Sequence, residues 1–330
     1  MKTPRIDFAV GGQAIIEGVL MRSPNFNIIS VRSPSGDIVE DQTKYQALVR
    51  RHRYLNVPIV RGVINMFEMM LIGTQALAFS SREALREVSQ VSKKAETSDT
   101  LKTKDIKPHK ATLAENLSLG FSLIFALVMS IFLFKFLPLW ITDFISQNFA
   151  ALKENYLLFN LVDGVLKTSF FLLYIAILSF IPDVKRLFRY HGAEHQSIMT
   201  YEKGLDLTVE NARGQSRFHP RCGTSFILIV FLISILVFTL LPRNPDFLTN
   251  FAIRLAFLPL VAGLSYEFLK LSAKSSDNWF FRIAIMPGLW MQRITTQPPD
   301  DSMLEVALNS LKLALAAEQN HINTQKDVVI

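Results

Sequence analysis

Cysteine is almost absent from this chain of 330 residues, in which Cys222 is the only one. A single cysteine excludes an internal disulfide, so we expect the polar parts of the chain to lie in a reducing compartment. The N-terminus also lacks the apolar stretch of a signal peptide, because Asp7, Gln13 and Glu17 fall where that stretch would be. We therefore expect no cleaved signal.

Motifs that bind nucleotides or nucleic acids are missing as well. The stretch GGQAIIEGVLMR at residues 11–22 lacks the G-K-[ST] ending of a phosphate-binding loop and is more simply a turn that leads into a strand. Interleaved basic and aromatic residues do not accompany the net charge of +7. We therefore expect no nucleic-acid partner, and the charge favours the anionic face of a lipid bilayer.

Apolar sequence is abundant and is arranged in long runs. Half of the residues are apolar, and many of the 26 phenylalanines lie in these runs. Runs of about 20 apolar residues are typical of transmembrane helices. The sequence predicts an α-helical polytopic membrane protein with about four transmembrane helices, near residues 117–139, 157–181, 225–241 and 247–271.

Basic residues are concentrated between the second and third of these runs. Residues 182–224 contain seven lysines and arginines, whereas residues 140–156 and 242–246 contain one each. The positive-inside rule therefore places residues 182–224 and both termini in the cytoplasm. We expect a multi-pass protein of the bacterial inner (plasma) membrane.

The segments outside the apolar runs have their own patterns. Turn residues separate AIIEGVLMRSP, NFNIISVRSP and GDIVEDQ, which predicts a small antiparallel sheet over residues 9–42. Arg61, Glu68 and Gln75 interrupt an apolar helical pattern, which favours an amphipathic helix over a membrane span. The chain thus divides into a cytoplasmic β-rich region (1–57), an amphipathic helix and polar linker (58–116), a membrane domain with a cytoplasmic loop (117–271), and an interfacial segment with a C-terminal helix (272–330).

Two histidines and a glutamate occur together in the basic segment, as His191-Gly-Ala-Glu194-His195. Positions i and i+4 of a helix lie on one face, so His191 and His195 can share one metal ion. Glu194 can then act as a general base on a metal-bound water, as in the H-x-x-E-H signature of inverted zincins. Gly204 is a suitable stop for such a helix.

A catalytic zinc needs a third protein ligand. His219 and Cys222 lie later in the same segment and are both good zinc ligands, while Glu17 and Glu267 are additional candidates as carboxylates in mostly apolar surroundings. The leading hypothesis is a metal-dependent hydrolase that acts at the membrane surface on a lipid, a membrane peptide or an amphipathic metabolite. Its divalent metal, with zinc favoured, is expected to be held by His191, His195 and either His219 or Cys222, with Glu194 as the catalytic residue.

Two other interpretations remain open. The histidines and the carboxylate can form a hydrogen-bonded brace in a non-catalytic membrane scaffold or assembly factor that binds a protein partner. Charged residues within the apolar runs can instead line the path of a transporter, although four spans without a visible repeat favour this less. These charged residues are Asp163, Lys167, Arg254 and Glu267, of which the first two are one helical turn apart and can pair.

Several long motifs resemble those of a known family. GGQAIIEGVLMRSP, YHGAEH, TVENARGQSRFHPRCGTSF, SYEFLKL and MPGLWMQRITTQPPDD resemble the YqhQ-like bacterial membrane proteins, a family of unknown function that is often labelled as a predicted metal-dependent enzyme. The resemblance covers residues 8–315 and implies a membrane location and a metal site, but no substrate. The family's motif positions fall on Glu17, His191, Glu194, His195, His219 and Cys222.

Overall fold

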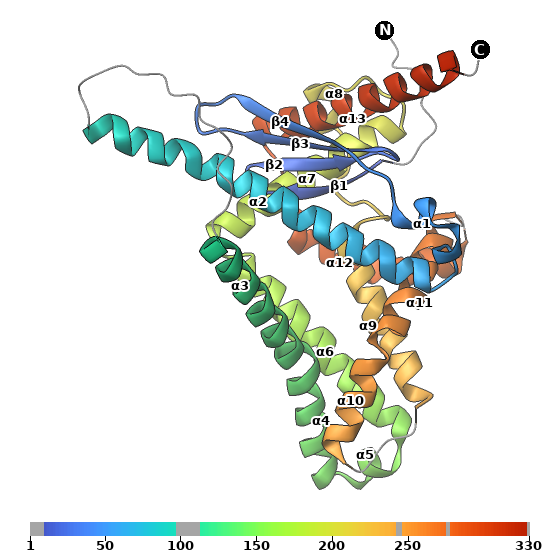
Figure 1. The fold of residues 1–330 in the computed structure, drawn as a ribbon. Helices are drawn as coiled ribbons and strands as arrows, with labels where there is room; N and C mark the ends of the chain where they lie inside the picture. The colour runs from blue at the N-terminus through green and yellow to red at the C-terminus, as the bar shows by residue number, and fades with distance from the viewer. Residues whose placement is uncertain (1–9, 97–112, 242–245, 275–277, 329–330) are drawn as a thin grey trace. The chain divides into compact units, whose positions relative to one another are not determined.

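The computed structural model describes residues 10–96, 113–241, 246–274 and 278–328 (Figure 1). The chain forms two compact units. The sheet unit comprises residues 1–90, 175–230 and 262–330, and the helical unit comprises residues 91–174 and 231–261.

The N-terminal strands form the predicted antiparallel sheet, with four strands in sequence order. The strands are β1 (Gly11–Ile15), β2 (Gly18–Arg22), β3 (Phe26–Arg32) and β4 (Ile38–Lys44). The stretch AIIEGVL, predicted as one strand, is a hairpin that turns at Ile16 and Glu17. Neither residue is a typical turn former, and Glu17 adopts a left-handed φ of 53°, so composition did not indicate this turn.

Helices cover both faces of the sheet (Figure 1). Val19 and Met21 of β2 pack with α7 (Pro182–Glu202) and α13 (Asp301–Val328). Leu20, between them, packs on the opposite face with α2 (Val60–Glu96). This alternation follows from the two-residue period of a strand, and it places α7 within the core of the sheet unit.

The sequence predicts that Asp301-Ser302 caps a C-terminal helix with Met303, Val306, Ala307, Ser310 and Leu311 on one face, and α13 buries that face. The cap is Asp300 instead, because the Met303 N–H donates to Asp300 Oδ1 at 3.0 Å. Further along, the buried carboxylate of Glu318 accepts hydrogen bonds from Ser23 Oγ at 2.8 Å and from the Asn25 N–H at 3.1 Å. These bonds hold the β2–β3 turn against the C-terminal helix.

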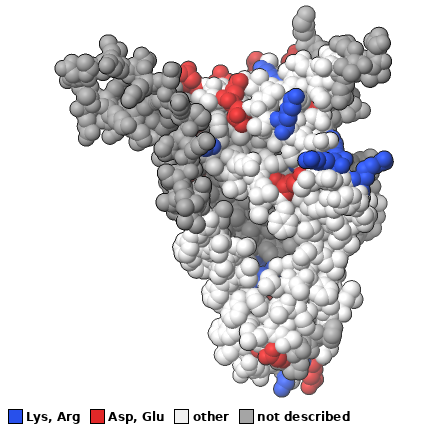
Figure 2. Space-filling model, in the orientation of Figure 1, with Lys and Arg blue, Asp and Glu red and all other residues white. Residues whose placement is uncertain are grey.

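The helical unit consists of apolar helices and helix segments. It begins with α3 (Leu113–Ile131), a π-helical turn (Phe132–Phe136), α4 (Leu137–Asn148) and α5 (Ala150–Glu154). Figure 2 shows few charged side chains on the visible surface of this unit outside its tip. The unit is completed by α10 (Phe247–Ala256) and by parts of α6 (Tyr156–Leu178), α9 (Gly223–Thr239) and α11 (Leu258–Lys274).

Within the residues that the structure describes, three helices are long and apolar enough to cross a membrane, namely Val60–Ala84, Gly120–Asn148 and Tyr156–Leu178. A fourth span is possible if the pair Phe247–Ala256 and Leu258–Ser272, bent by 41°, counts as one. The chain is therefore mostly helical, with three to four candidate spans and a small N-terminal sheet.

The candidate spans differ in part from the predicted ones. Helix α2 meets the same criterion of length and composition although its charges favoured an amphipathic helix, whereas α9 is shorter than a usual span. The predicted fourth span is broken at Phe257, because Pro259 lacks the N–H that would continue the helical ladder.

Replacing Glu318 with alanine tests the tie between α13 and the sheet. The Glu318→Ala variant leaves the donors of Ser23 and Asn25 without their acceptor, so we expect the free energy of unfolding to fall by about 1–3 kcal/mol. The measurement is unfolding of the full-length protein in detergent, followed by circular dichroism. Glu305→Ala is the control, because the Glu305 side chain is 59% exposed in its pair with Arg32 and its loss should matter little. Equal effects of the two variants would contradict the assignment.

Candidate metal centre

Helix α7 ends where its sequence predicted. Pro182 occupies its first turn, and the helix ends at Glu202, just before Gly204 with a left-handed φ of 68°. A Cβ on Gly192 would lie 2.2 Å from the carbonyl oxygen of Gln297, so only glycine allows this close contact. The segment after α12 (Trp279–Thr295) therefore packs directly against the helix that carries the two histidines.

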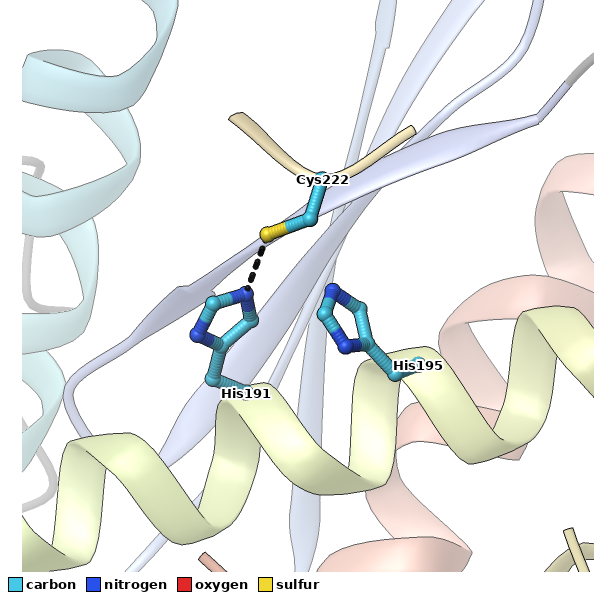
Figure 3. A group of neighbouring side chains, drawn as sticks. All are labelled: His191, His195 and Cys222. Atoms are coloured by element: carbon cyan, nitrogen blue, oxygen red, sulfur yellow. Dashed lines mark hydrogen bonds between the residues drawn. The ribbon is translucent and has the colours of Figure 1, made fainter. Parts of the chain in front are cut away.

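The structure brings His191, His195 and Cys222 together. Their ligand atoms all lie within 4.8 Å of one another, and His191 Nε2 lies 3.2 Å from Cys222 Sγ. Figure 3 shows the two imidazoles on successive turns of α7, with Cys222 on a separate segment opposite them. Tetrahedral zinc holds nitrogen and sulfur ligands about 3.4–3.6 Å apart, so shifts of the side chains would be needed to accommodate the ion.

Backbone carbonyls determine which nitrogen of each imidazole carries the proton. His191 Nδ1 lies 2.8 Å from the Thr295 carbonyl oxygen, and His195 Nδ1 lies 2.6 Å from that of Arg217. A carbonyl oxygen only accepts hydrogen bonds, so Nδ1 is the donor in both rings. In the neutral rings both Nε2 atoms then keep a lone pair, which is the form that binds a metal.

Cys222 lies immediately before the first residue of α9. The Thr224 N–H donates to Cys222 Sγ at 3.4 Å, and the Thr224 hydroxyl lies 3.1 Å from the same sulfur. Donors at the N-terminus of a helix favour negative charge on a nearby group. Two donors of Thr224 therefore face the sulfur of Cys222 at the start of α9.

Glu194 lies beside both histidines. One of its carboxylate oxygens, Oε2, is 3.6 Å from His195 Nε2 and 3.9 Å from His191 Nε2. Burial raises the pKa of Glu194, and the nearby histidines and a hydrogen bond from the Gly12 N–H oppose this rise. A buried carboxyl group in this position can accept or return a proton next to the two ligand atoms.

His219 lies next to the group, but both of its ring nitrogens have partners. Nδ1 accepts a hydrogen bond from the Arg221 N–H at 3.3 Å, and Nε2 lies 3.2 Å from Glu202 Oε2. Burial lowers the pKa of His219 and of His195, which favours neutral rings. Of the two predicted third ligands, Cys222 is therefore the one in the group with the histidines. His219 lies beside the group, with its ring centroid 5.6 Å from that of His195.

Glu202 is a polar partner of the site that sequence reasoning missed. Its carboxylate pairs with Arg221 as well as with His219. The available signal was its position seven residues after His195, which places both side chains on one face of α7.

The structure places the two additional carboxylates in ion pairs away from this group. Glu17 accepts hydrogen bonds from Arg186, one of them at 2.5 Å, and its Oε2 lies 3.3 Å from the Tyr190 hydroxyl. Glu267 accepts a hydrogen bond from Arg61 Nε at 2.6 Å. Both carboxylates therefore connect structural elements in the sheet unit.

Comparison with known proteins identifies the family. A family model described as "Protein of unknown function (DUF1385)" matches residues 57–317. The chain belongs to this family. It is also 33% identical to the "Uncharacterized protein YqhQ" of Bacillus subtilis (strain 168), over 97% of this chain and 98% of that protein. No solved structure matches the chain.

These matches confirm the resemblance to YqhQ-like proteins, and neither description states a reaction. The DUF1385 match includes α7 and Cys222, whereas the sheet, with Gly12 and Glu17, precedes it. The sheet residues that contact the site therefore lie outside the region that defines the family model.

Gly12 gives a sharp test of how the sheet holds Glu194. A Cβ at this position would lie 2.7 Å from Glu194 Cγ and 2.9 Å from the Leu20 carbonyl oxygen. We expect the Gly12→Ala variant to lower the free energy of unfolding by about 1–3 kcal/mol, because β1 or Glu194 must shift. The matched control is Gly11→Ala, whose Cβ would meet no atom within 4 Å. If thermal unfolding of the two variants were the same, the close packing of β1 on α7 would be wrong.

Proposed function

We propose that this chain is a metal-dependent hydrolase associated with a membrane, and that His191, His195 and Cys222 hold its divalent metal, with zinc favoured. The observation that supports this most directly is the convergence of two imidazole Nε2 atoms and one thiol sulfur from two separate segments. Two histidines and one cysteine form a ligand set that suits zinc and leaves a fourth position open. Bound zinc would supply Lewis acidity toward a carbonyl or phosphoryl oxygen.

Glu194 is the residue that we propose for proton transfer. Its carboxylate is buried and lies within 4 Å of both imidazole Nε2 atoms. Burial raises the pKa of Glu194 and so brings it closer to neutral pH, where a general base works best. The Gly12 N–H and the packed sheet hold the carboxylate in one orientation, so the same carboxylate oxygen would accept and return the proton.

The carbonyl acceptors of Thr295 and Arg217 are the orienting groups. They hold each imidazole through Nδ1 and thereby direct Nε2 toward Cys222. Outer contacts of this kind orient metal ligands in proteins and raise their basicity. His219 and Glu202 form a further polar layer beside His195.

The substrate that fits this proposal is presented by a membrane. Three to four helices of the chain are candidate spans, and α6 ends at Leu178, shortly before α7 begins. The basic residues of 182–224 and the single reduced cysteine favour a cytoplasmic site and cytoplasmic termini at the inner membrane. We therefore propose a lipid, a membrane peptide or an amphipathic metabolite with a hydrolysable bond as the substrate class.

A non-catalytic scaffold is the second candidate, and one observation favours it. The imidazoles and the thiol already satisfy one another, since His191 bonds to both Thr295 and Cys222. A cluster that is satisfied in this way can brace α7 against its neighbours without a metal. The experiments below separate the two functions.

Metal content is the first measurement. We expect about one zinc per chain in full-length protein purified in detergent without a histidine tag, measured by elemental mass spectrometry. His191→Ala and Cys222→Ala should lose the metal, because each removes one of three ligands. His219→Ala is the matched control and should retain it, since His219 bonds to Glu202 and Arg221 instead. A folded wild-type protein without metal after zinc loading would rule out the metal site.

Glu194→Gln separates proton transfer from metal binding. The amide keeps the size of the side chain but cannot accept the proton, so we expect metal content to be retained and hydrolysis to fall about 100-fold or more. The assay presents ester, amide and phosphodiester substrates in mixed micelles to the zinc-loaded protein. Glu202→Gln serves as a control for a carboxylate near the site whose side chain is 31% exposed. Unchanged hydrolysis in Glu194→Gln would remove Glu194 from the mechanism.

A further inference from the structure

A cluster of charged side chains lies inside the helical unit. Asp163 Oδ2 accepts hydrogen bonds from Lys167 Nζ and from Arg254, which confirms the predicted pairing of Asp163 with Lys167. Arg254 also donates to Asn160 Oδ1 at 2.5 Å. Asp163 and Lys167 are each only 1% exposed, so water cannot screen their charges.

The cluster contains more basic than acidic side chains. The cationic groups of Lys135, Lys167 and Arg254 lie 5.7, 5.6 and 5.1 Å from the centroid of the Phe238 ring. Among the described side chains of the helical unit, Asp163 is the carboxylate that pairs with Lys167 and Arg254. An aromatic face attracts cations but does not neutralise them, so a counter-charge would stabilise the cluster.

Two buried polar atoms of the cluster have no partner in the part of the chain that the structure describes. These atoms are Lys135 Nζ and Asp163 Oδ1. Lys135 belongs to the π-helical turn between α3 and α4, an irregularity that is frequent at functional sites. A buried amine without a partner is costly unless a ligand or a counter-charge accompanies it.

A small cavity adjoins the cluster. Its volume of about 10 Å³ is close to the space that one water molecule needs. Asn250 lines it and is 5% exposed, and no described residue makes a hydrogen bond with its side-chain amide. The other lining residues are Asn160 and Arg254 on the polar side and Phe159, Phe238, Leu241 and Ile253 on the apolar side.

We propose that this cavity binds one small monovalent inorganic anion, with chloride as the representative ion. Asn250 Nδ2 and the Arg254 guanidinium are the donors that would contact it, and the edges of the phenylalanine rings carry partial positive charge. Lys135 and Lys167 are further basic groups near Phe238. Phosphate is much larger than chloride and fits so small a cavity less well. The site is independent of the proposed hydrolase centre, whose residues all belong to the sheet unit.

Direct binding of radioactive chloride tests this proposal. Full-length protein is purified in detergent and in gluconate buffer, and equilibrium dialysis is performed at constant ionic strength. We expect about one chloride per chain, together with a saturable rise in the thermal unfolding temperature when chloride replaces gluconate. Asn250→Leu removes the unpartnered donor at similar volume and should weaken binding about tenfold or more. Lys135→Met removes a cation that forms no hydrogen bond or ion pair in the described structure, and it should weaken binding as well.

Two control variants make the test specific. Asn148→Leu and Lys153→Met make the same chemical changes at exposed positions of the helical unit and should bind chloride like the wild type. Folded wild-type protein that binds no chloride would overturn the proposal and leave the cavity to water. Chloride binding that is equal in Asn250→Leu and in the wild type would also overturn it, because the ion would then lie elsewhere. The Asn250 variant decides the matter by itself if Lys135→Met does not fold.

Discussion

The burial of α7 between the sheet and the segment that follows α12 is the constraint on which the candidate metal centre depends. Two close approaches produce it, one where β1 reaches Glu194 at Gly12 and one where Gln297 reaches Gly192. A side chain at either glycine would separate the layers. Because the layers are in contact, a polar helix is enclosed, and its histidines find backbone carbonyls instead of water.

Both units enclose polar side chains, but these side chains differ in how many hydrogen-bond partners they have. In the sheet unit the ligand atoms of His191, His195 and Cys222 lie within 4.8 Å of one another, and both imidazoles have backbone carbonyls as partners. In the helical unit Lys167 and Arg254 share one carboxylate, and Lys135 Nζ and Asp163 Oδ1 remain without partners among the described residues. Because unsatisfied buried groups are costly, the charged cluster supports the proposed anion, whereas the geometry of the histidines and Cys222 supports the proposed metal ion.

Local patterns predicted much of the fold. Turn residues between short runs indicated the antiparallel sheet over residues 9–42, and the helical spacing of Met303 and Leu311 indicated the buried face of α13. Patterns failed where a local rule was broken or was ambiguous. Glu17 turns the first hairpin with a backbone conformation that its residue type disfavours, and Pro259 breaks an apolar run that was long enough to span a membrane.

For the candidate site, the sequence by itself determined that His191 and His195 share one helix face with Glu194 beside them, because helical geometry depends only on nearby residues. The tertiary structure alone decided between Cys222 and His219 as the third member of the group, and it placed Glu17 and Glu267 in ion pairs with Arg186 and Arg61. It also decided the imidazole tautomers, through carbonyls at Arg217 and Thr295. These choices depend on how separate segments pack, and packing is set by contacts over long sequence distances that no local period records.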